Sequence, residues 1–231
     1  QLQDPATYAH MGFEERVALL VDAEWNSRQN NKLIRCIREA RFAEPGAAVE
    51  DIEYYEDRHL DKAQLLRFTT CDFISKGHHI IFKGASGNGK TYLACAMGNA
   101  ACRKLLSVRY IRLPELFEEL SLAQAAGELK KAIKSYQKYD LLILDDLGAE
   151  RGTEYALEQV FAVIDARYRS RKPLIVTTNL TLDALKHPDD LAHARIYDRI
   201  LEICAPILFG GENLRVEKAN EITGKLNCFN F

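Results

Sequence analysis

The stretch from residue 84 to residue 91 has a spacing of glycine, lysine and threonine that is suited to holding a polyphosphate. Gly84, Gly89, Lys90 and Thr91 fill every fixed position of the pattern G-x-x-x-x-G-K-[S/T]. Glycines let consecutive backbone N–H groups turn inward around phosphate oxygens, and the helix that follows points its positive end at them. In this pattern the lysine reaches the β- and γ-phosphates, and the threonine hydroxyl ligates Mg²⁺. We therefore expect a nucleoside triphosphate and Mg²⁺ at this loop.

The residues around the loop match the arrangement that the pattern requires. Residues 79–83 are mostly apolar and indicate a short buried strand, and residues 92–106 are apolar or small with no proline, as in a helix on a sheet. A chance glycine-rich turn is the alternative, and a strand before the loop with a helix after it argues against that. The candidate nucleotide-binding residues are Gly84, Gly87, Asn88, Gly89, Lys90, Thr91 and Tyr92.

Two adjacent acids follow a strand made of aliphatic residues. Residues 141–144 are all Leu or Ile, and Asp145 and Asp146 come directly after them. An acid at the carboxyl end of a buried strand is where a phosphate-loop fold holds its metal ion, so Asp145 is the candidate partner of Mg²⁺ beside Thr91. Asp146 is the candidate group that orients or deprotonates an attacking water. Helix capping is the alternative interpretation of adjacent acids.

Four polar residues in the last third of the chain are weaker candidates. Asn179 follows the strand expected at 173–178 and is placed to hold a water near the γ-phosphate, although a turn or helix cap has the same composition. Arg195 and Arg199 are four apart on one helical face, and Arg215 follows the last expected strand. Arginine stabilises a transferring phosphoryl group through its fixed fork of donors. A surface arginine, or one paired with a nearby acid, is an equally good interpretation of each.

The composition is that of an ordinary globular protein without a strong overall charge. Of the 231 residues, 47% are hydrophobic and 28% are charged, and the net charge is −2. Contact with nucleic acid must therefore come from a local basic face. The six cysteines are scattered with no C-x-x-C pair, so we expect a reducing cytosol and no zinc site. No apolar run is long enough to cross a membrane, which predicts a cytoplasmic protein.

The hydrophobic pattern divides the chain into three parts. These are a helical N-terminal region at 1–45, a linker and helix at 46–75, and an α/β domain at 76–231. In the domain, short apolar strands alternate with helices, which predicts a parallel five-stranded sheet covered by helices on both faces. The expected strands are 79–83, 107–113, 141–144, 173–178 and 207–209.

The N-terminal region has helical spacing of apolar residues over 13–41, which predicts one or two helices forming a small unit. Its other face is basic. A solvated helix face and a surface for phosphates or a partner protein are equally compatible with this pattern. The basic residues are Arg16, Arg28, Lys32, Arg35, Arg38 and Arg41.

The chain resembles the IstB-like and DnaC-like ATPases of the AAA+ class along nearly its whole length. The helical residues 13–25 and 39–42, the loop with its continuation over 84–96, and the segment 141–148 are similar to IstB helpers of transposition. The later part, residues 177–180 and 195–199, is closer to DnaC-type helicase loaders. The resemblance implies a P-loop fold of the AAA+ type with ATP as its nucleotide.

The resemblance also implies roles for individual residues. Asn179 would be the sensor-one residue, and Arg215 the sensor-two arginine that touches nucleotide in its own subunit. Arg199, with Arg195 as second candidate, would be the arginine finger that enters a neighbouring subunit's site, which implies a homo-oligomer. Asp146 stands where many AAA+ enzymes have Glu. Because Asp reaches about one methylene less, slower hydrolysis is expected.

DNA is a further partner that the resemblance implies. The two helices expected between residues 113 and 139 look like the extra helices of the initiator and loader clade, which line a central DNA channel. Their lysines are then candidate phosphate contacts, although lysines on a helix surface are usually only solvated. These are Lys130, Lys131, Lys134 and Lys138.

Three functions follow from these features. The first is an ATP-hydrolysing helper of transposition that assembles on DNA and delivers it to a transposase. The second is a loader that binds a replicative helicase through residues 1–60 and single-stranded DNA through its ring. The third, a small-molecule P-loop kinase, needs a lid and an acceptor pocket that the sequence does not show.

Overall fold

A parallel sheet of five strands forms the centre of the computed structural model, which describes residues 11–52, 60–148, 153–188 and 190–210. The strand order is β2-β3-β4-β1-β5, and every neighbouring pair is parallel. The predicted five-stranded parallel sheet is confirmed. The strands are β1 (His79–Gly84), β2 (Val108–Arg112), β3 (Leu141–Leu147), β4 (Leu174–Thr178) and β5 (Cys204–Phe209).

Alternate residues of the strands supply two hydrophobic cores, one on each face of the sheet. Ile80 of β1 belongs to the first core and Ile81 to the second. In β3, Ile143 belongs to the first core, whereas Leu142 and Leu144 belong to the second. Successive side chains of a strand point to opposite faces. Burial of both faces therefore explains why these strands are continuously aliphatic.

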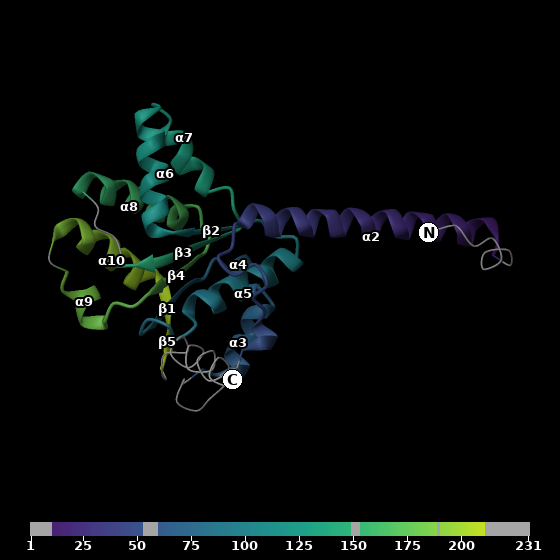
Figure 1. Ribbon diagram of the computed structural model, residues 1–231, viewed down its shortest axis with the longest axis horizontal. Coiled ribbons are helices and arrows are strands. Elements are labelled where there is room, and N and C mark those ends of the chain that lie inside the picture. Colours follow the sequence, from purple (N-terminus) through teal and green to yellow (C-terminus); the bar gives the residue numbers. More distant parts are fainter. Residues whose placement is uncertain (1–10, 53–59, 149–152, 189, 211–231) are drawn as a thin grey trace, which may run out of the picture.

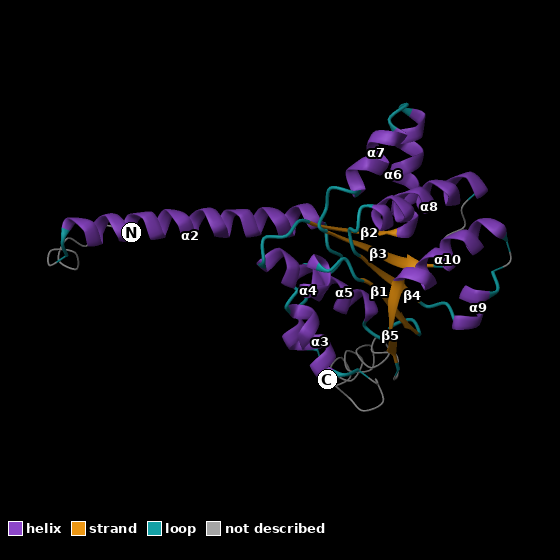
Figure 2. Cartoon of the chain, turned by 180° about the vertical axis from the view of Figure 1, so that it is seen from behind, coloured by secondary structure: helices purple, strands orange, loops and turns teal. Residues whose placement is uncertain are grey.

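Helices cover both faces of the sheet (Figure 1; Figure 2 shows the opposite side). The first core lies under α3 (Lys62–Thr69), α4 (Asp72–Ser75) and α5 (Lys90–Arg103), and two further helices described below also contribute to it. The second core lies under α6 (Leu113–Ala125), α7 (Leu129–Tyr136), α8 (Glu154–Arg169), α9 (Leu182–Lys186) and α10 (Leu191–Ile203). The expected break at Pro188 falls between α9 and α10.

The N-terminal region contains one long helix, α2 (Phe13–Ala40), which projects from the rest of the molecule (Figure 1). No glycine or proline interrupts its 28 residues. Its last turns reach the first core, where Cys36 and Ala40 are buried. Its apolar residues nearer the start face outward, with Phe13 82% and Trp25 62% exposed. The predicted helical character is confirmed, but these side chains form no core of their own within the described residues. No described helix, α2 included, is both long and apolar enough to cross a membrane.

The start of the expected linker packs against α5. Ala47 and Val49 are buried in the first core, and a short 3₁₀ helix, η1 (Val49–Asp51), continues the contact. The side-chain amide of Asn99 in α5 donates to the carbonyl oxygens of Pro45 and Ala47 over 3.1 and 2.9 Å. Within residues 46–52, Ala47, Val49 and Ile52 are thus buried against the domain, and the assignment of a linker to this part of the chain stays a prediction. Residues 53–59 lie outside the described part.

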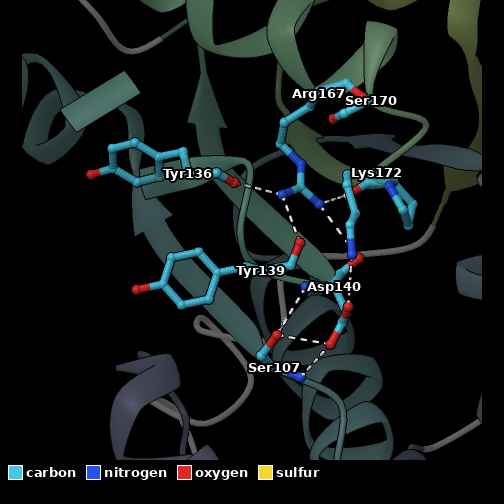
Figure 3. A network of polar contacts seen from close by, with 8 residues as sticks. Ser107, Tyr136, Tyr139, Asp140, Arg167, Ser170 and Lys172 are labelled. Carbon is cyan, nitrogen blue, oxygen red and sulfur yellow. Dashed lines mark hydrogen bonds and ion pairs between the residues drawn. The ribbon is translucent and has the colours of Figure 1, made fainter. Parts of the chain in front are cut away.

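A buried arginine joins the segments that enter β3 and β4. Arg167 of α8 is fully buried, and its Nη1 donates to the carbonyl oxygens of Tyr136 and Tyr139 over 2.6 and 2.9 Å (Figure 3). Its Nη2 donates to the carbonyl oxygen of Pro173 over 2.6 Å. Burial lowers the pKa of Arg167 to about 9. These bonds satisfy carbonyl groups at the amino edge of the sheet, opposite to the edge that carries the phosphate loop.

Candidate nucleotide-binding site

The phosphate loop, residues 85–89, joins the carboxyl end of β1 to the first residue of α5. Gly87 and Gly89 have φ angles of 85° and 82°, in the left-handed region that favours glycine. Gly84 lies against β5, because a Cβ added there would be 2.5 Å from the carbonyl oxygen of Phe209. Backbone conformation or close packing therefore requires all three glycines, and the wrapped shape of the loop follows from them.

Lys90 begins α5, and its ammonium group lies over the loop. Its Nζ donates to the carbonyl oxygens of Gly84 and Ala85 over 2.9 and 2.7 Å, and the residue is 8% exposed. The side-chain amide of Asn88 donates to the carbonyl oxygen of Gly210 over 3.0 Å and ties the loop to the end of β5. The ammonium group and the positive end of α5 together favour a polyanion at this position.

Asp145, near the carboxyl end of β3, meets hydroxyl groups from three other elements. Its Oδ1 lies 3.0 Å from Thr91 Oγ1 of α5 and accepts from Thr177 Oγ1 of β4 over 2.5 Å. Its Oδ2 accepts from the Tyr110 hydroxyl of β2 over 2.7 Å. Asp145 is 2% exposed, and burial together with this carboxylate raises the pKa of Tyr110 above its usual value. The carboxylate is thus held next to the phosphate loop from three sides.

The strand is irregular at the two acids, which turns their side chains in different directions. The register of β3 with β4 shifts between Leu144 and Leu147, and Asp146 has a φ of 63°. Such a bulge re-aims the side chains beside it. Asp145 faces α5, whereas Asp146 lies at the edge of the site with a 41% exposed side chain and accepts two hydrogen bonds from Arg112. The structure therefore separates the predicted metal ligand from the predicted water-orienting group.

The donor set fits Mg²⁺. The Thr91 hydroxyl and the Asp145 carboxylate are hard oxygen ligands and converge within 3.0 Å. Mg²⁺ is usually held by one or two protein oxygens and completes its shell with water and substrate phosphates, which agrees with this small set. Thr91 and Asp145 would hold the ion, and it would neutralise charge on the phosphate oxygens.

A family model described as "IstB-like ATP binding protein" matches residues 1–221. The chain belongs to the IstB-like ATP-binding family. An insertion-sequence ATP-binding protein of Sinorhizobium fredii is 35% identical over 205 residues, which cover 87% of this chain and 82% of the relative. The replicative helicase loader DnaI of Bacillus subtilis is 30% identical over 150 residues, which cover 61% of this chain and 48% of the loader.

The solved structures confirm the fold of this IstB-like protein. The crystal structure of DnaI superimposes with a TM-score of 0.58 at 26% identity, covering 73% of this chain and 90% of the DnaI chain. The predicted resemblance to IstB-like and DnaC-type AAA+ proteins is confirmed, and so is the P-loop AAA+ fold. An ATP-binding role follows from the family and agrees with the geometry of the loop.

Three predicted site residues of this IstB-like chain are not shown to reach the phosphate loop: the nucleotide contacts Tyr92 and Arg215, and Asn179, which is predicted to hold a water. The hydroxyl of Tyr92 accepts from the backbone N–H of Ala48 over 3.4 Å, so it ties α5 to the N-terminal segment. Asn179 is exposed after β4, and Thr177, two residues earlier, is the side chain that reaches Asp145. Arg215 lies outside the described residues. The nucleotide contacts of Tyr92 and Arg215 and the water-holding role of Asn179 stay predictions.

The two arginines predicted to act across subunits lie on α10 and contact α8. Arg195 is 3.7 Å from the carboxylate of Glu158, and its guanidinium stacks over the ring of Phe161. Arg199 pairs with Asp165 at 3.5 Å and also with Glu202 at 3.0 Å. Within the described chain both are therefore held by their own subunit, and Arg199 is the more tightly held. Their action in a neighbouring site stays a prediction.

The lysines predicted to contact DNA are exposed on or just after α7. The helix is amphipathic, because Leu129, Ala132 and Ile133 pack on the second core. Exposure of the opposite side is compatible with phosphate contacts and with plain solvation. The exposed residues are Lys130, Lys131, Lys134 and Lys138, of which Lys131 pairs with Glu128 at 3.0 Å.

Sequence reasoning missed Tyr110, Thr177 and Arg112, which all bond to the two acids. Tyr110 and Arg112 lie on β2, the strand next to β3, and Arg112 is in register with Asp145. Thr177 lies on β4, the other neighbour of β3. Polar residues near the carboxyl ends of adjacent parallel strands meet at one edge. Applied to the predicted strands, this rule would have found the three residues once the strand order was known.

Proposed function

We propose that this protein hydrolyses ATP and, in its ATP-bound state, assembles with copies of itself on DNA to deliver that DNA to a transposase. The observation that most directly supports hydrolysis is the 3.0 Å contact of Thr91 with Asp145 beside the phosphate loop, with Asp146 next in the chain. Membership of the IstB-like family and the insertion-sequence relative support the link to transposition.

The side chains divide the chemistry among them. Backbone N–H groups of residues 85–89 and the ammonium group of Lys90 bind the triphosphate and offset its charge. Thr91 and Asp145 would hold Mg²⁺, which would neutralise negative charge on the phosphate oxygens while the terminal phosphoryl group is transferred to water and ADP is released. Asp146 orients the attacking water and accepts its proton through the carboxylate at the exposed edge of the site. Asn179 holds the same water from the end of β4.

A neighbouring subunit completes the site in this proposal. Arg199 of α10, with Arg195 as second candidate, supplies a guanidinium to the terminal phosphate of the adjacent subunit's ATP. Arg215 contacts nucleotide within its own subunit. Assembly then depends on ATP because the nucleotide lies between two subunits, and hydrolysis weakens that interface. A basic surface on each subunit would bind the phosphates of DNA.

The test measures ATP turnover and assembly together. The purified full chain is incubated with ATP and Mg²⁺, with and without duplex DNA. Phosphate release is followed, and the particles are imaged by electron microscopy. The proposal expects ATP-dependent assemblies on duplex DNA and turnover that responds to DNA. Lys90→Ala should show neither, whereas Lys76→Ala, an exposed lysine away from the loop, should behave as wild type. Turnover indifferent to DNA, with no assembly, would contradict the proposal and favour a metabolite kinase.

A helicase loader is the second candidate, favoured by the similarity to DnaI. Both functions share the ATP site and differ in the protein partner and the form of DNA. Pulldown of a replicative helicase by the full chain, together with preference for single-stranded DNA, would support the loader. Assemblies on duplex DNA that do not bind the helicase would support the transposition helper.

A further inference from the structure

A polar pocket of about 460 Å³ lies where the end of α2 meets β2, α6 and α7. It is separate from the phosphate loop, because its β2 residue, Arg109, is near the amino end of that strand, whereas the loop follows the carboxyl end of β1. Three arginines contribute to its wall. The lining residues are Arg38, Glu39, Arg41, Arg109, Glu119, Ser135, Tyr136 and Tyr139.

One carboxylate, that of Glu119, serves two of these arginines. The Nη2 of Arg109 donates to Glu119 Oε1 over 2.7 Å, and Arg41 Nη1 is 3.7 Å from the same oxygen. The other oxygen of Glu119 accepts from the hydroxyl of Tyr136. Arg38 forms no ion pair with any residue in the described ranges. The pocket therefore has more guanidinium donors than its acids satisfy. One of the three guanidinium groups, that of Arg109, is buried and so has a fixed position.

The pocket also continues a basic strip on α2. At 100° per residue, Arg28, Lys32, Arg35 and Arg38 fall within an arc of about 120°, and they cover about 15 Å along the helix. That length matches about four base steps of a DNA strand at 3.4 Å each. The lysines of α7 lie on the other side, since α7 supplies Ser135 and Tyr136 to the pocket wall. Two basic helices thus meet at one set of arginines.

We propose that this pocket binds a backbone phosphate of DNA and positions the strand that runs along α2. The proposal rests on the DNA binding put forward above and names the residues that provide it. Arg38 and Arg41 are exposed and donate directly to the phosphate oxygens. The Arg41 contact with Glu119 is loose at 3.7 Å, so a phosphate competes with it readily. Arg109 stays on Glu119 and keeps the positive charge at the base of the pocket.

The test is binding of a fluorescently labelled duplex to the full chain with a non-hydrolysable ATP analogue, measured over a series of salt concentrations. The double variant Arg38→Gln, Arg41→Gln should weaken binding on the order of tenfold or more. It should also reduce the slope of log K against log salt by about two, because two phosphate contacts are lost. The control variant is Arg103→Gln, which removes one positive charge at the end of α5, where Arg103 is 3.7 Å from Glu50. It should leave the slope of log K against log salt unchanged.

A variant with the opposite expected sign separates this site from general damage to the fold. Glu119→Gln removes the charge that competes for Arg41 and leaves one amide oxygen to accept from Arg109 or Tyr136. Loss of the Arg109 ion pair should lower stability, whereas duplex binding by the folded chain should become tighter by a few-fold. Equal slopes for the double variant and the Arg103→Gln control would overturn the pocket assignment while leaving DNA binding itself intact. Absence of duplex and single-strand binding by the wild-type chain would overturn both proposals.

Discussion

Arg112 and Asp146 form a two-point ion pair at the edge of the nucleotide site, in which Nε and Nη2 of the arginine donate to Asp146 Oδ2 over 3.1 and 2.8 Å. The contact raises the pKa of Arg112 above its usual value. It joins β2 to the bulge in β3, which contains Asp146. One oxygen of the carboxylate assigned to the attacking water, Oδ2, is therefore engaged by an arginine of its own subunit, and this contact would compete with the proposed action of Asp146 on water.

Removal of the arginine should increase ATP turnover measured without DNA. Both side chains are about half exposed, at 50% and 41%, and exposed ion pairs contribute roughly 0.2–1 kcal/mol. Because 1.36 kcal/mol is a factor of ten in rate, Arg112→Ala should raise basal phosphate release by about 1.5- to 5-fold. Arg112→Lys keeps the charge but loses the two-point contact, so its basal phosphate release should lie between those of the wild type and Arg112→Ala. A decrease as large as that of Asp146→Asn would mean that Arg112 assists the reaction instead.

Mixed assemblies test whether Arg199 acts in a neighbouring subunit. Arg199→Ala should keep ATP binding and lose on the order of 10³-fold or more in turnover, because an arginine finger contributes about that much. Mixing it with Lys90→Ala subunits should restore part of the activity, since some interfaces then combine an intact loop with an intact Arg199. Arg169→Ala removes another arginine that pairs with Asp165 and should stay near wild-type activity. Failure of the mixture to recover, with Arg195→Ala behaving like Arg199→Ala, would exclude this assignment.

Stability should fall as the solution is acidified, because of a buried histidine at the start of β1. His79 Nδ1 accepts from the backbone N–H of Leu174 over 3.2 Å, which requires the neutral ring. Burial, with a smaller effect of Arg167, lowers the pKa of His79 from 6.5 to about 4. Between these values the unfolded chain binds more protons than the folded chain, so stability is complete above about pH 6.5 and decreases toward pH 4.

Urea denaturation at pH 7 and pH 5 measures this dependence. The wild-type chain should lose stability over that interval, and His79→Gln should start lower but lose less, since its side chain does not titrate. His78→Gln removes an exposed neighbour and should keep the wild-type slope. Parallel losses in the wild type and His79→Gln would show that other groups cause the pH dependence.

The Arg167 contacts should matter for stability and not for nucleotide binding. Arg167→Met leaves the carbonyl oxygens of Tyr136, Tyr139 and Pro173 without their guanidinium donor and should destabilise the fold by about 3–5 kcal/mol. Arg169→Met, on the same helix with a side chain that is 77% exposed, should change stability by less than about 1 kcal/mol. Urea midpoints measure the difference. ATP affinity of the folded fraction should be unchanged, and a loss of affinity would indicate a role for Arg167 in the site.

The sequence predicts the part of the site that depends on neighbours in the chain. The glycine spacing identifies Lys90 and Thr91, and the aliphatic run before Asp145 identifies its strand. The contacts of Tyr110 and Thr177 with Asp145 depend on β3 lying between β2 and β4, and no local pattern states that order. The direction of Asp146 depends on a bulge at one non-glycine residue, which residue type does not indicate.

The N-terminal region shows the same limit on a larger scale. The pattern over 13–41 predicts helix, and the structure has one helix there. Apolar spacing alone does not say whether a face meets a core. Trp25 fits the helical period as well as Cys36 does, yet the first is 62% exposed and the second is buried. The polar pocket lined by Arg38, Arg41 and Arg109 could likewise not be predicted from the sequence, because it forms only where α2 lies against β2.

Phosphate release from ATP by wild type and Asp146→Asn tests the proposed hydrolysis most directly, with nucleotide affinity measured in parallel. The wild-type chain should release phosphate only with Mg²⁺. Asp146→Asn should bind ATP with unchanged affinity. It should release phosphate at least about 10²-fold more slowly than the wild type, as expected when a general base is removed. Equal rates in the two proteins, or wild-type turnover that continues after Mg²⁺ is chelated, would contradict the assignment of Asp146, Asp145 and Thr91.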